Sequence, residues 1–180
     1  MKILIFIPHM GLGGVERSFI NLSKEFKNRG HNVKFVSLND IKSTYNEDLK
    51  FIKLNSKRTA FSINKLSKTF NNESPDLIIS AQYYANIIAV ISSKFSKNKA
   101  KIIISERNHL SSELKKLNLF KRLIISSLIK FLYKKADLIY GNSDAVCNDL
   151  KKFFNLKIKI KKILNASFIE NINKLSKEKV

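Results

Sequence analysis

Cysteine is almost absent from this sequence, and acidic residues are scarce. Cys147 is the only cysteine in 180 residues, so the chain cannot form an internal disulfide or a cysteine-based zinc site. Such usage is typical of a reducing compartment. The 14 Asp and Glu residues stand against 34 Lys and Arg residues, which gives a net charge of +20. Because 44% of the residues are apolar, we expect one compact domain with a buried core.

Long hydrophobic runs are also missing. The longest uncharged stretch, Leu77 to Ser93, is interrupted by polar residues such as Ser80 and Asn86 and falls short of a membrane span. The apolar stretch over residues 3–7 is too short for the hydrophobic region of a signal peptide. We therefore expect this stretch to be a buried strand, and the protein to be cytoplasmic.

The excess positive charge predicts partners that carry phosphate. A field of this sign attracts nucleic acid, anionic lipid or a nucleotide, although the codon bias of an AT-rich genome would also produce a lysine-rich chain. Between Glu113 and Asp137, basic and apolar residues are interleaved with no acid, which indicates a basic amphipathic helix. Such a helix lies on an anionic membrane or packs on the core with a solvated basic face. The membrane interpretation assigns the contact to Lys115, Lys116, Lys121 and Arg122.

Short apolar runs alternate with longer segments of helical period, which is the pattern of βα units. We therefore predict an α/β fold: a doubly wound, Rossmann-like parallel sheet of about seven strands with helices on both faces. Asn39–Tyr45 is expected to be a flexible loop. Strands are expected at Lys2–Pro8, Asn32–Leu38, Lys50–Leu54, Asp76–Ser80, Lys101–Ser105, Asp137–Gly141 and Ile160–Leu164. Helices are expected at Val15–Asn28, Ala60–Asn71, Tyr84–Ser96, Ser111–Lys135 and Ser143–Phe154.

The loop after the first strand contains three glycines before a helix. In an open parallel sheet, ligands bind at the carboxyl ends of the strands, and free N–H groups at a helix start can hold a phosphate. The loop lacks the G-x-G-x-x-G fingerprint, because Glu16 stands at the third position, and it is not a P-loop. It is either a phosphate cradle at Gly13 and Gly14 or a tight turn without a ligand.

Two polar clusters follow predicted strands. Arg17 gains nothing from the helix dipole, which favours a contact with phosphate or a carboxylate, whereas Glu16 would stabilise the helix start or bind a polar ligand. The densest cluster runs from Glu106 to His109 and could bind hydroxyl groups or stabilise developing charge. It could equally be an ion-paired surface loop. No spacing of His, Asp and Glu indicates a metal site, and none is expected.

Four motifs occur in a fixed order along the chain. Ile3 to Leu38 reads ILIFIPHMGLGGVERSFINLSKEFKNRGHNVKFVSL, with a GG-x-E-R loop and a K-x-R-G-H-x-V turn. IIISERN at 102–108, ADLIYGNSDAVCNDL at 136–150 and IKIKKILNASFIENINKLSKE at 158–178 follow. Together they resemble the N-terminal domain of family-four-type glycosyltransferases of GT-B fold, over nearly the whole chain. The family's Asn-Pro before the second domain is here Asn165-Ala166.

The resemblance implies a domain organisation and a reaction. Residues 1–165 would form the Rossmann-like, acceptor-side domain, and residues 166–180 would begin the linker to a C-terminal donor-binding domain. That second domain carries the family's E-x7-E motif and the basic residues for the nucleotide diphosphate. The enzyme would be a retaining hexosyltransferase without a metal or other cofactor, active in cell-envelope polysaccharide synthesis. This chain alone would be inactive without the C-terminal domain or a partner subunit.

The resemblance also implies roles for individual residues. Catalysis would involve Glu106, Arg107 and His109, and the donor phosphates would contact Gly13, Gly14, Asn142 and Ser143. The acceptor side would include His9, Glu16, Arg17 and Asn108. The expected partners are a nucleotide-sugar, a lipid-linked or glycan acceptor and the anionic inner face of the cell membrane, where the protein would be peripheral. The alternatives are a non-catalytic glycan- or partner-binding half-enzyme and a basic domain that binds nucleic acid or membrane surfaces; no nucleic-acid partner is expected under the enzyme interpretation.

Overall fold

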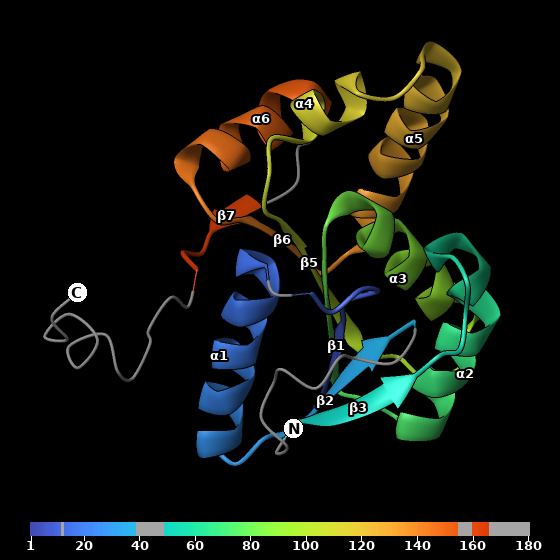
Figure 1. Ribbon diagram of the computed structural model, residues 1–180, viewed down its shortest axis with the longest axis vertical. Helices are drawn as coiled ribbons and strands as arrows, with labels where there is room; N and C mark the ends of the chain where they lie inside the picture. Colours follow the sequence, from blue (N-terminus) through green and yellow to red (C-terminus); the bar gives the residue numbers. More distant parts are fainter. Residues whose placement is uncertain (12, 39–48, 155–159, 166–180) are drawn as a thin grey trace, which may run out of the picture.

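Seven parallel strands form one sheet. A computed structural model describes residues 1–11, 13–38, 49–154 and 160–165, and the statements below concern these residues. The strands lie in the order β3-β2-β1-β4-β5-β6-β7, and every neighbouring pair is parallel (Figure 1). Their bounds are β1 Lys2–Phe6, β2 Asn32–Ser37, β3 Lys50–Lys53, β4 Leu77–Ala81, β5 Lys101–Glu106, β6 Leu138–Gly141 and β7 Ile160–Lys162. The predicted doubly wound fold is confirmed.

The helices cover both faces of this sheet. α1 (Gly14–Asn28) packs on one face, where Phe19 and Ile20 join Ile3, Ile5 and Phe35 in an apolar cluster. The opposite face is covered through side chains such as Phe70, Ala89 and Leu132. The elements on that side are η1 (Thr59–Ser62), α2 (Ile63–Glu73), α3 (Tyr83–Phe95), α4 (Leu110–Lys115), α5 (Leu119–Leu132), η2 (Tyr133–Lys135) and α6 (Asp144–Phe154). The period-3.6 pattern of α1 explains why one of its stripes is buried.

The predicted single helix over Ser111–Lys135 is wrong. The structure has α4, then α5, then the 3-10 turn η2 in that interval. The break lies at Asn118, whose extended backbone starts α5 and whose side chain accepts a hydrogen bond from the Lys121 N–H at 2.9 Å. An asparagine cap of this kind satisfies a free N–H at a helix start, so the local gain outweighs the continuous apolar period. The predictions for residues 39–45 and 166–180 lie outside the described residues.

Candidate functional site

The loops that follow β1, β4, β5 and β6 share the carboxyl edge of the sheet. β1 lies between β2 and β4, so the sheet order reverses there and the chain winds in opposite directions on the two sides. In such folds ligands bind beyond this reversal point, because the two flanking loops diverge. The sequence-predicted residues are therefore brought to one edge, from His9 after β1 to Ser143 after β6.

In the first loop, Glu16 folds back over the glycines. A Cβ added at Gly13 would lie 2.5 Å from Glu16 Oε2, so glycine permits the close approach of this carboxylate to the backbone. Gly13 is the N-cap of α1 in an extended conformation, and its carbonyl accepts the Arg17 N–H at 3.1 Å. Glu16 thus stands at the positive end of the helix, which is the place predicted for a phosphate. The side chains of Arg17 and His9 are exposed at this edge.

Glu106 is not exposed at the ligand edge of the sheet, where the sequence predicted a polar cluster that includes it. The residue is 3% exposed, and its carboxylate Oε1 accepts hydrogen bonds from the Tyr133 hydroxyl and from Asn86 Nδ2, the latter at 2.8 Å. Asn86 Oδ1 in turn accepts from Ser80 Oγ at 2.7 Å. These side chains tie β4, β5, α3 and η2 together in the interior. The carboxylate has a structural place, and its geometry gives no support to a direct role in catalysis.

Burial sets the protonation of this network. Loss of hydration raises the pKa of Glu106 from 4.5 to about 7, against the opposing effect of the hydrogen bonds from Tyr133 and Asn86. Burial also raises the pKa of Tyr133 well above its usual value, with the Glu106 carboxylate adding to that effect. A protonated Glu106 can remain buried without a cationic partner, so the network holds together near neutral pH.

Arg107 is a buried cation. The residue is 8% exposed, and its guanidinium carbon lies 4.6 Å from the centre of the Phe19 ring and 5.5 Å from that of Tyr140. It donates to Tyr140 Oη at 3.2 Å and to Ser18 Oγ at 3.4 Å, and also to Asn165 Oδ1. Burial lowers the pKa of Arg107, and Tyr140 opposes this effect. Among the described residues no carboxylate forms an ion pair with it.

Three buried polar atoms near the ends of β5 and β6 lack hydrogen-bond partners among the described residues. They are Ser105 Oγ, Arg107 Nε and Asn142 Oδ1. Ser105 is in register with Tyr140, so all three atoms belong to the same short stretch of two adjacent strands. Unsatisfied buried groups are uncommon in folded proteins and concentrate where function requires them. This part of the edge therefore holds the buried polar atoms whose hydrogen bonds are not satisfied within the described residues.

Asn108 and His109 are exposed and lie just before α4. The start of α4 is attached to α6, because the Asp149 carboxylate accepts both the Ser111 N–H, at 3.0 Å, and the Ser111 hydroxyl. The His109 carbonyl accepts the N–H groups of Ser112 and Glu113, each at 3.1 Å. The imidazole of His109 is thus presented from a hydrogen-bonded turn after β5.

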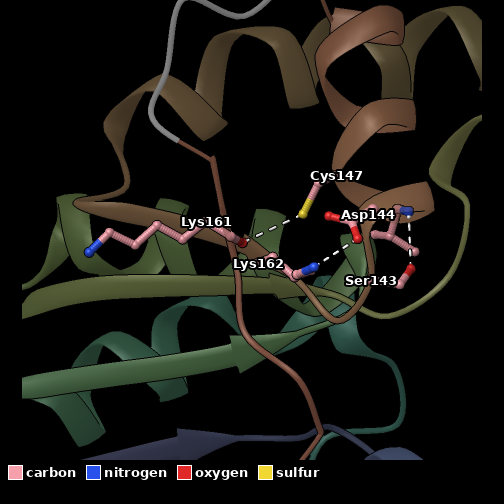
Figure 2. A network of polar contacts seen from close by, with 6 residues as sticks. Ser143, Asp144, Cys147, Lys161 and Lys162 are labelled. Carbon is pink, nitrogen blue, oxygen red and sulfur yellow. Dashed lines mark hydrogen bonds and ion pairs between the residues drawn. The ribbon is translucent and has the colours of Figure 1, made fainter.

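Asn142 and Ser143, the predicted phosphate ligands after β6, lie at the start of α6. Ser143 Oγ accepts the Val146 N–H at 3.2 Å, and Asp144 pairs with Lys162 of β7 at 2.7 Å (Figure 2). Cys147 Sγ faces the Lys161 carbonyl at 3.6 Å and is buried, so this thiol is part of the packing. The Ser143 hydroxyl already caps the helix, and the adjacent Asp144 carboxylate brings negative charge to the predicted phosphate position.

The sequence prediction missed Gln82, Tyr84 and Asn86. Gln82 follows β4 with φ 73 and ψ 140, a backbone conformation that residues other than glycine rarely adopt. The Tyr84 hydroxyl donates to Gln82 Oε1. Burial, followed by the Glu16 carboxylate, raises the pKa of Tyr84. The available signal was position alone, since Gln82 and Tyr84 directly follow a buried strand.

The outer face of α5 is both apolar and basic. Phe120 is 74% exposed, Phe131 65%, Leu119 63%, Leu123 59% and Ile124 45%. Of the four predicted membrane-facing cations, Lys115 and Lys121 are exposed, Arg122 is half-buried, and Lys116 pairs with Glu113 at 2.8 Å. In Figure 1, α5 stands at the periphery of the molecule, on the side away from α1. Within the described residues no helix has the length and apolarity to cross a bilayer, and no group of three or more His, Cys, Asp and Glu side chains could hold a metal.

A Rossmann-like parallel sheet with a polar edge at its reversal point defines a class of ligand-binding α/β domains. The family model for Glycosyltransferase Family 4 matches residues 12–166. The chain therefore belongs to Glycosyltransferase Family 4, as the sequence motifs indicated.

A curated relative agrees with this assignment, and solved structures share the fold. A Campylobacter jejuni protein, N-acetylgalactosamine-N,N'-diacetylbacillosaminyl-diphospho-undecaprenol 4-alpha-N-acetylgalactosaminyltransferase, is 32% identical over 200 residues, which cover 99% of this chain and 52% of that protein. The chain thus spans about half the length of the curated relative it matches. Among solved structures, Anabaena HepE in complex with UDP has a TM-score of 0.69 at 19% identity, covering 92% of this chain and 44% of HepE. The lipopolysaccharide outer core galactosyltransferase WaaB has a TM-score of 0.67 at 20% identity, covering 92% of this chain and 46% of WaaB.

Proposed function

We propose that this chain is the acceptor-binding half of a retaining glycosyltransferase. The enzyme would move a sugar from a nucleotide-sugar donor to a lipid-linked glycan acceptor in cell-envelope polysaccharide synthesis. The observation that carries the proposal is the 32% identity, over nearly the whole chain, to a transferase whose name specifies a glycan on diphospho-undecaprenol. The presence of UDP in the HepE structure supports a nucleotide-sugar as donor.

The exposed cations and imidazoles at the sheet edge suit a diphosphate-linked acceptor. The Arg17 guanidinium would pair with the acceptor diphosphate, because its planar N–H groups match phosphate oxygens. His9, Asn108 and His109 would hydrogen-bond the acceptor sugar or its attacking hydroxyl. Glu16 would orient the same sugar from above the glycine loop. The donor diphosphate would be held mainly by a second domain or a partner subunit.

A binding titration tests this proposal on the chain itself. Farnesyl-diphospho-N-acetylgalactosamine is a soluble probe that carries the diphosphate and the sugar. We expect the chain to bind it with measurable heat in calorimetry and Arg17→Ala to weaken that binding about 10-fold, since a charge-assisted contact is lost. Lys24→Ala removes an exposed charge from the same helix away from the edge and should leave the affinity unchanged. A wild-type chain that does not bind the probe would contradict the proposal.

We also propose that α5 attaches the protein to the anionic inner face of the cell membrane. The helix presents exposed Phe and Leu side chains together with Lys121 and Lys130, a combination suited to an interface that is apolar inside and negative at its surface. A lipid-linked acceptor would be reached in that plane.

Two rival interpretations make different predictions. A binding half-enzyme would show no transfer after a second domain is added. A nucleic-acid-binding domain would bind random duplex in a salt-dependent way.

A further inference from the structure

Gln82 holds an unfavourable backbone conformation at the reversal point of the sheet. Its φ of 73 and ψ of 140 lie in a region that glycine tolerates and other residues avoid. Two hydrogen bonds fix this turn: the Gln82 N–H donates to the Ser105 carbonyl at 3.0 Å, and the Asn86 N–H donates to the Gln82 carbonyl at 2.9 Å. Both bonds involve the backbone of Gln82, so glycine would make them equally well. The turn therefore does not explain why a glutamine stands there.

The side chain of Gln82 offers the better explanation. Its Oε1 accepts the Tyr84 hydroxyl, which orients the amide. Its Nε2 has no hydrogen-bond partner within the described part of the chain, and the residue is half-buried. Tyr84 is also half-buried, and burial, followed by the Glu16 carboxylate, raises its pKa. The Gln82 amide, with two free N–H donors, and the Tyr84 phenol therefore stand together at the start of α3, while Glu16 lies in the first turn of α1.

This combination has the chemistry of sugar recognition. Hydroxyl and acetamido groups need both donors and acceptors at fixed positions. The amide N–H groups of Gln donate hydrogen bonds, and the carboxylate oxygens of Glu accept them. Tyr84 adds an aromatic ring with a polar tip. Strained residues persist where the surrounding structure holds them and tend to mark ligand-binding positions.

We propose that Gln82 and Tyr84 form a sugar-reading pair that determines which terminal acceptor sugar is accepted. The Gln82 amide donates to an oxygen of that sugar, and Tyr84 fixes the direction of the amide. The strained turn then has a function, because it places the Gln82 side chain directly after the end of β4. The inference rests on the proposed function and adds a residue-level determinant of specificity to it.

The test separates the sugar from the lipid diphosphate. Isothermal titration calorimetry would compare farnesyl diphosphate with farnesyl-diphospho-N-acetylgalactosamine. We expect the wild-type chain to bind the sugar-bearing probe more tightly, and Gln82→Ala and Gln82→Gly to lose about 5- to 10-fold of that preference, the size of one or two lost hydrogen bonds. Both variants should retain the affinity for farnesyl diphosphate. Gln82→Gly should also raise the melting temperature by about 2–4 °C, because it relieves the strain.

Asn55→Gly is the matched control. Asn55 has a φ of 47, is exposed and lies after the edge strand β3. This variant relieves a positive φ elsewhere and should leave both affinities unchanged. A wild-type chain that binds both probes equally would overturn the sugar-reading pair and leave the acceptor-half proposal intact. Gln82 variants that keep the sugar preference would overturn it too, and would make the strain purely structural. Failure of the wild type to bind either probe would overturn the proposed function, and the pair with it.

Discussion

Glu106 is a buried carboxyl group with a pKa near the pH of the cell, and this makes stability depend on pH. Between pH 4.5 and about 7 the unfolded chain ionises this group while the folded chain keeps its proton. Folding stability is therefore greatest at the lower pH and falls as pH rises through the folded-state pKa, by up to about 3 kcal/mol. Urea unfolding at pH 5.5 and pH 8 should show about 2 kcal/mol of this loss for the wild type relative to Glu106→Gln, which cannot ionise, because the first part of the loss occurs below pH 5.5. Parallel pH profiles for the two proteins would contradict a buried, titrating Glu106.

Gly141 is required by packing at the end of β6. A Cβ there would lie 2.9 Å from Cys147 Sγ and 3.2 Å from the Cys147 backbone nitrogen, and the backbone cannot yield easily. We expect Gly141→Ala to reduce the free energy of unfolding by about 1–3 kcal/mol, measured by chemical denaturation. Gly14→Ala is the comparison, because a Cβ at Gly14 meets nothing within 4 Å and alanine favours the helix. Equal stabilities of the two variants would count against this packing.

Some site residues could be predicted from the sequence and others could not. His9, Arg17 and His109 follow apolar runs, so their place at the carboxyl edge came from the βα pattern alone. By the same rule Glu106 was expected at that edge, but it faces the interior. β5 extends one residue beyond its predicted end and includes Glu106. The alternation of side chains along a strand then turns Glu106 toward Asn86 and Tyr133. Asn86 and Tyr133 are 20 and 27 residues away from Glu106 in the sequence, so no local sequence pattern predicts these contacts.

At the scale of elements, α5 carries the membrane proposal. Phe120→Glu should weaken binding to vesicles of phosphatidylcholine and phosphatidylglycerol by about 10-fold or more, because a buried phenyl ring contributes about 1.5–3 kcal/mol. Phe95→Glu is a matched control: Phe95 is 70% exposed and Phe120 74%, but Phe95 ends α3. Vesicle sedimentation measures both. Equal losses in the two variants, or equally strong binding to random duplex, would show that the attraction is unspecific charge.

The attachment of α4 to α6 should control the loop that carries His109. Asp149→Ala removes the acceptor for the Ser111 N–H and hydroxyl, so the first turn of α4 should open more often. Hydrogen exchange of residues 111–115 should become at least several-fold faster, with about 1 kcal/mol less local stability. Asn148→Ala, at the exposed neighbouring position, should leave exchange unchanged. If both variants exchange alike, another contact holds α4.

The helix predictions failed where two strong signals competed. The stretch from Ser111 to Lys135 has a continuous apolar period, and this favours one helix. The cap at Asn118 is a single-residue signal of about 1 kcal/mol, but it also lets α4 turn toward α6. Strand order, by contrast, was not stated from the sequence, since the partners of β1 come from distant segments. The predicted strands themselves all occur, and the central ones have the compact apolar signature of buried parallel strands.

For the whole molecule, the acceptor-half proposal predicts that the chain binds its acceptor without turnover. The resemblance places the family's E-x7-E motif in a second domain, so the isolated chain should show no transfer above background from UDP-N-acetylgalactosamine to the farnesyl-linked acceptor. Product formation would be followed by mass spectrometry. Addition of a separately produced family C-terminal domain, or its fusion after Val180, should restore transfer with retained anomeric configuration. Turnover by the isolated chain would contradict the division of labour proposed above.

The position of β1 in the middle of the sheet has a consequence for protein synthesis. The backbone N–H of Lys2 bonds to Asp76, 74 positions later, and Ile3 is in register with Leu77. While the ribosome makes the intervening segment, one side of the central strand has no partner, and its row of isoleucines is open to chaperones or to neighbouring nascent chains. Slowed translation over the stretch before β4 should therefore reduce the soluble yield, whereas the same delay after β6 should be harmless.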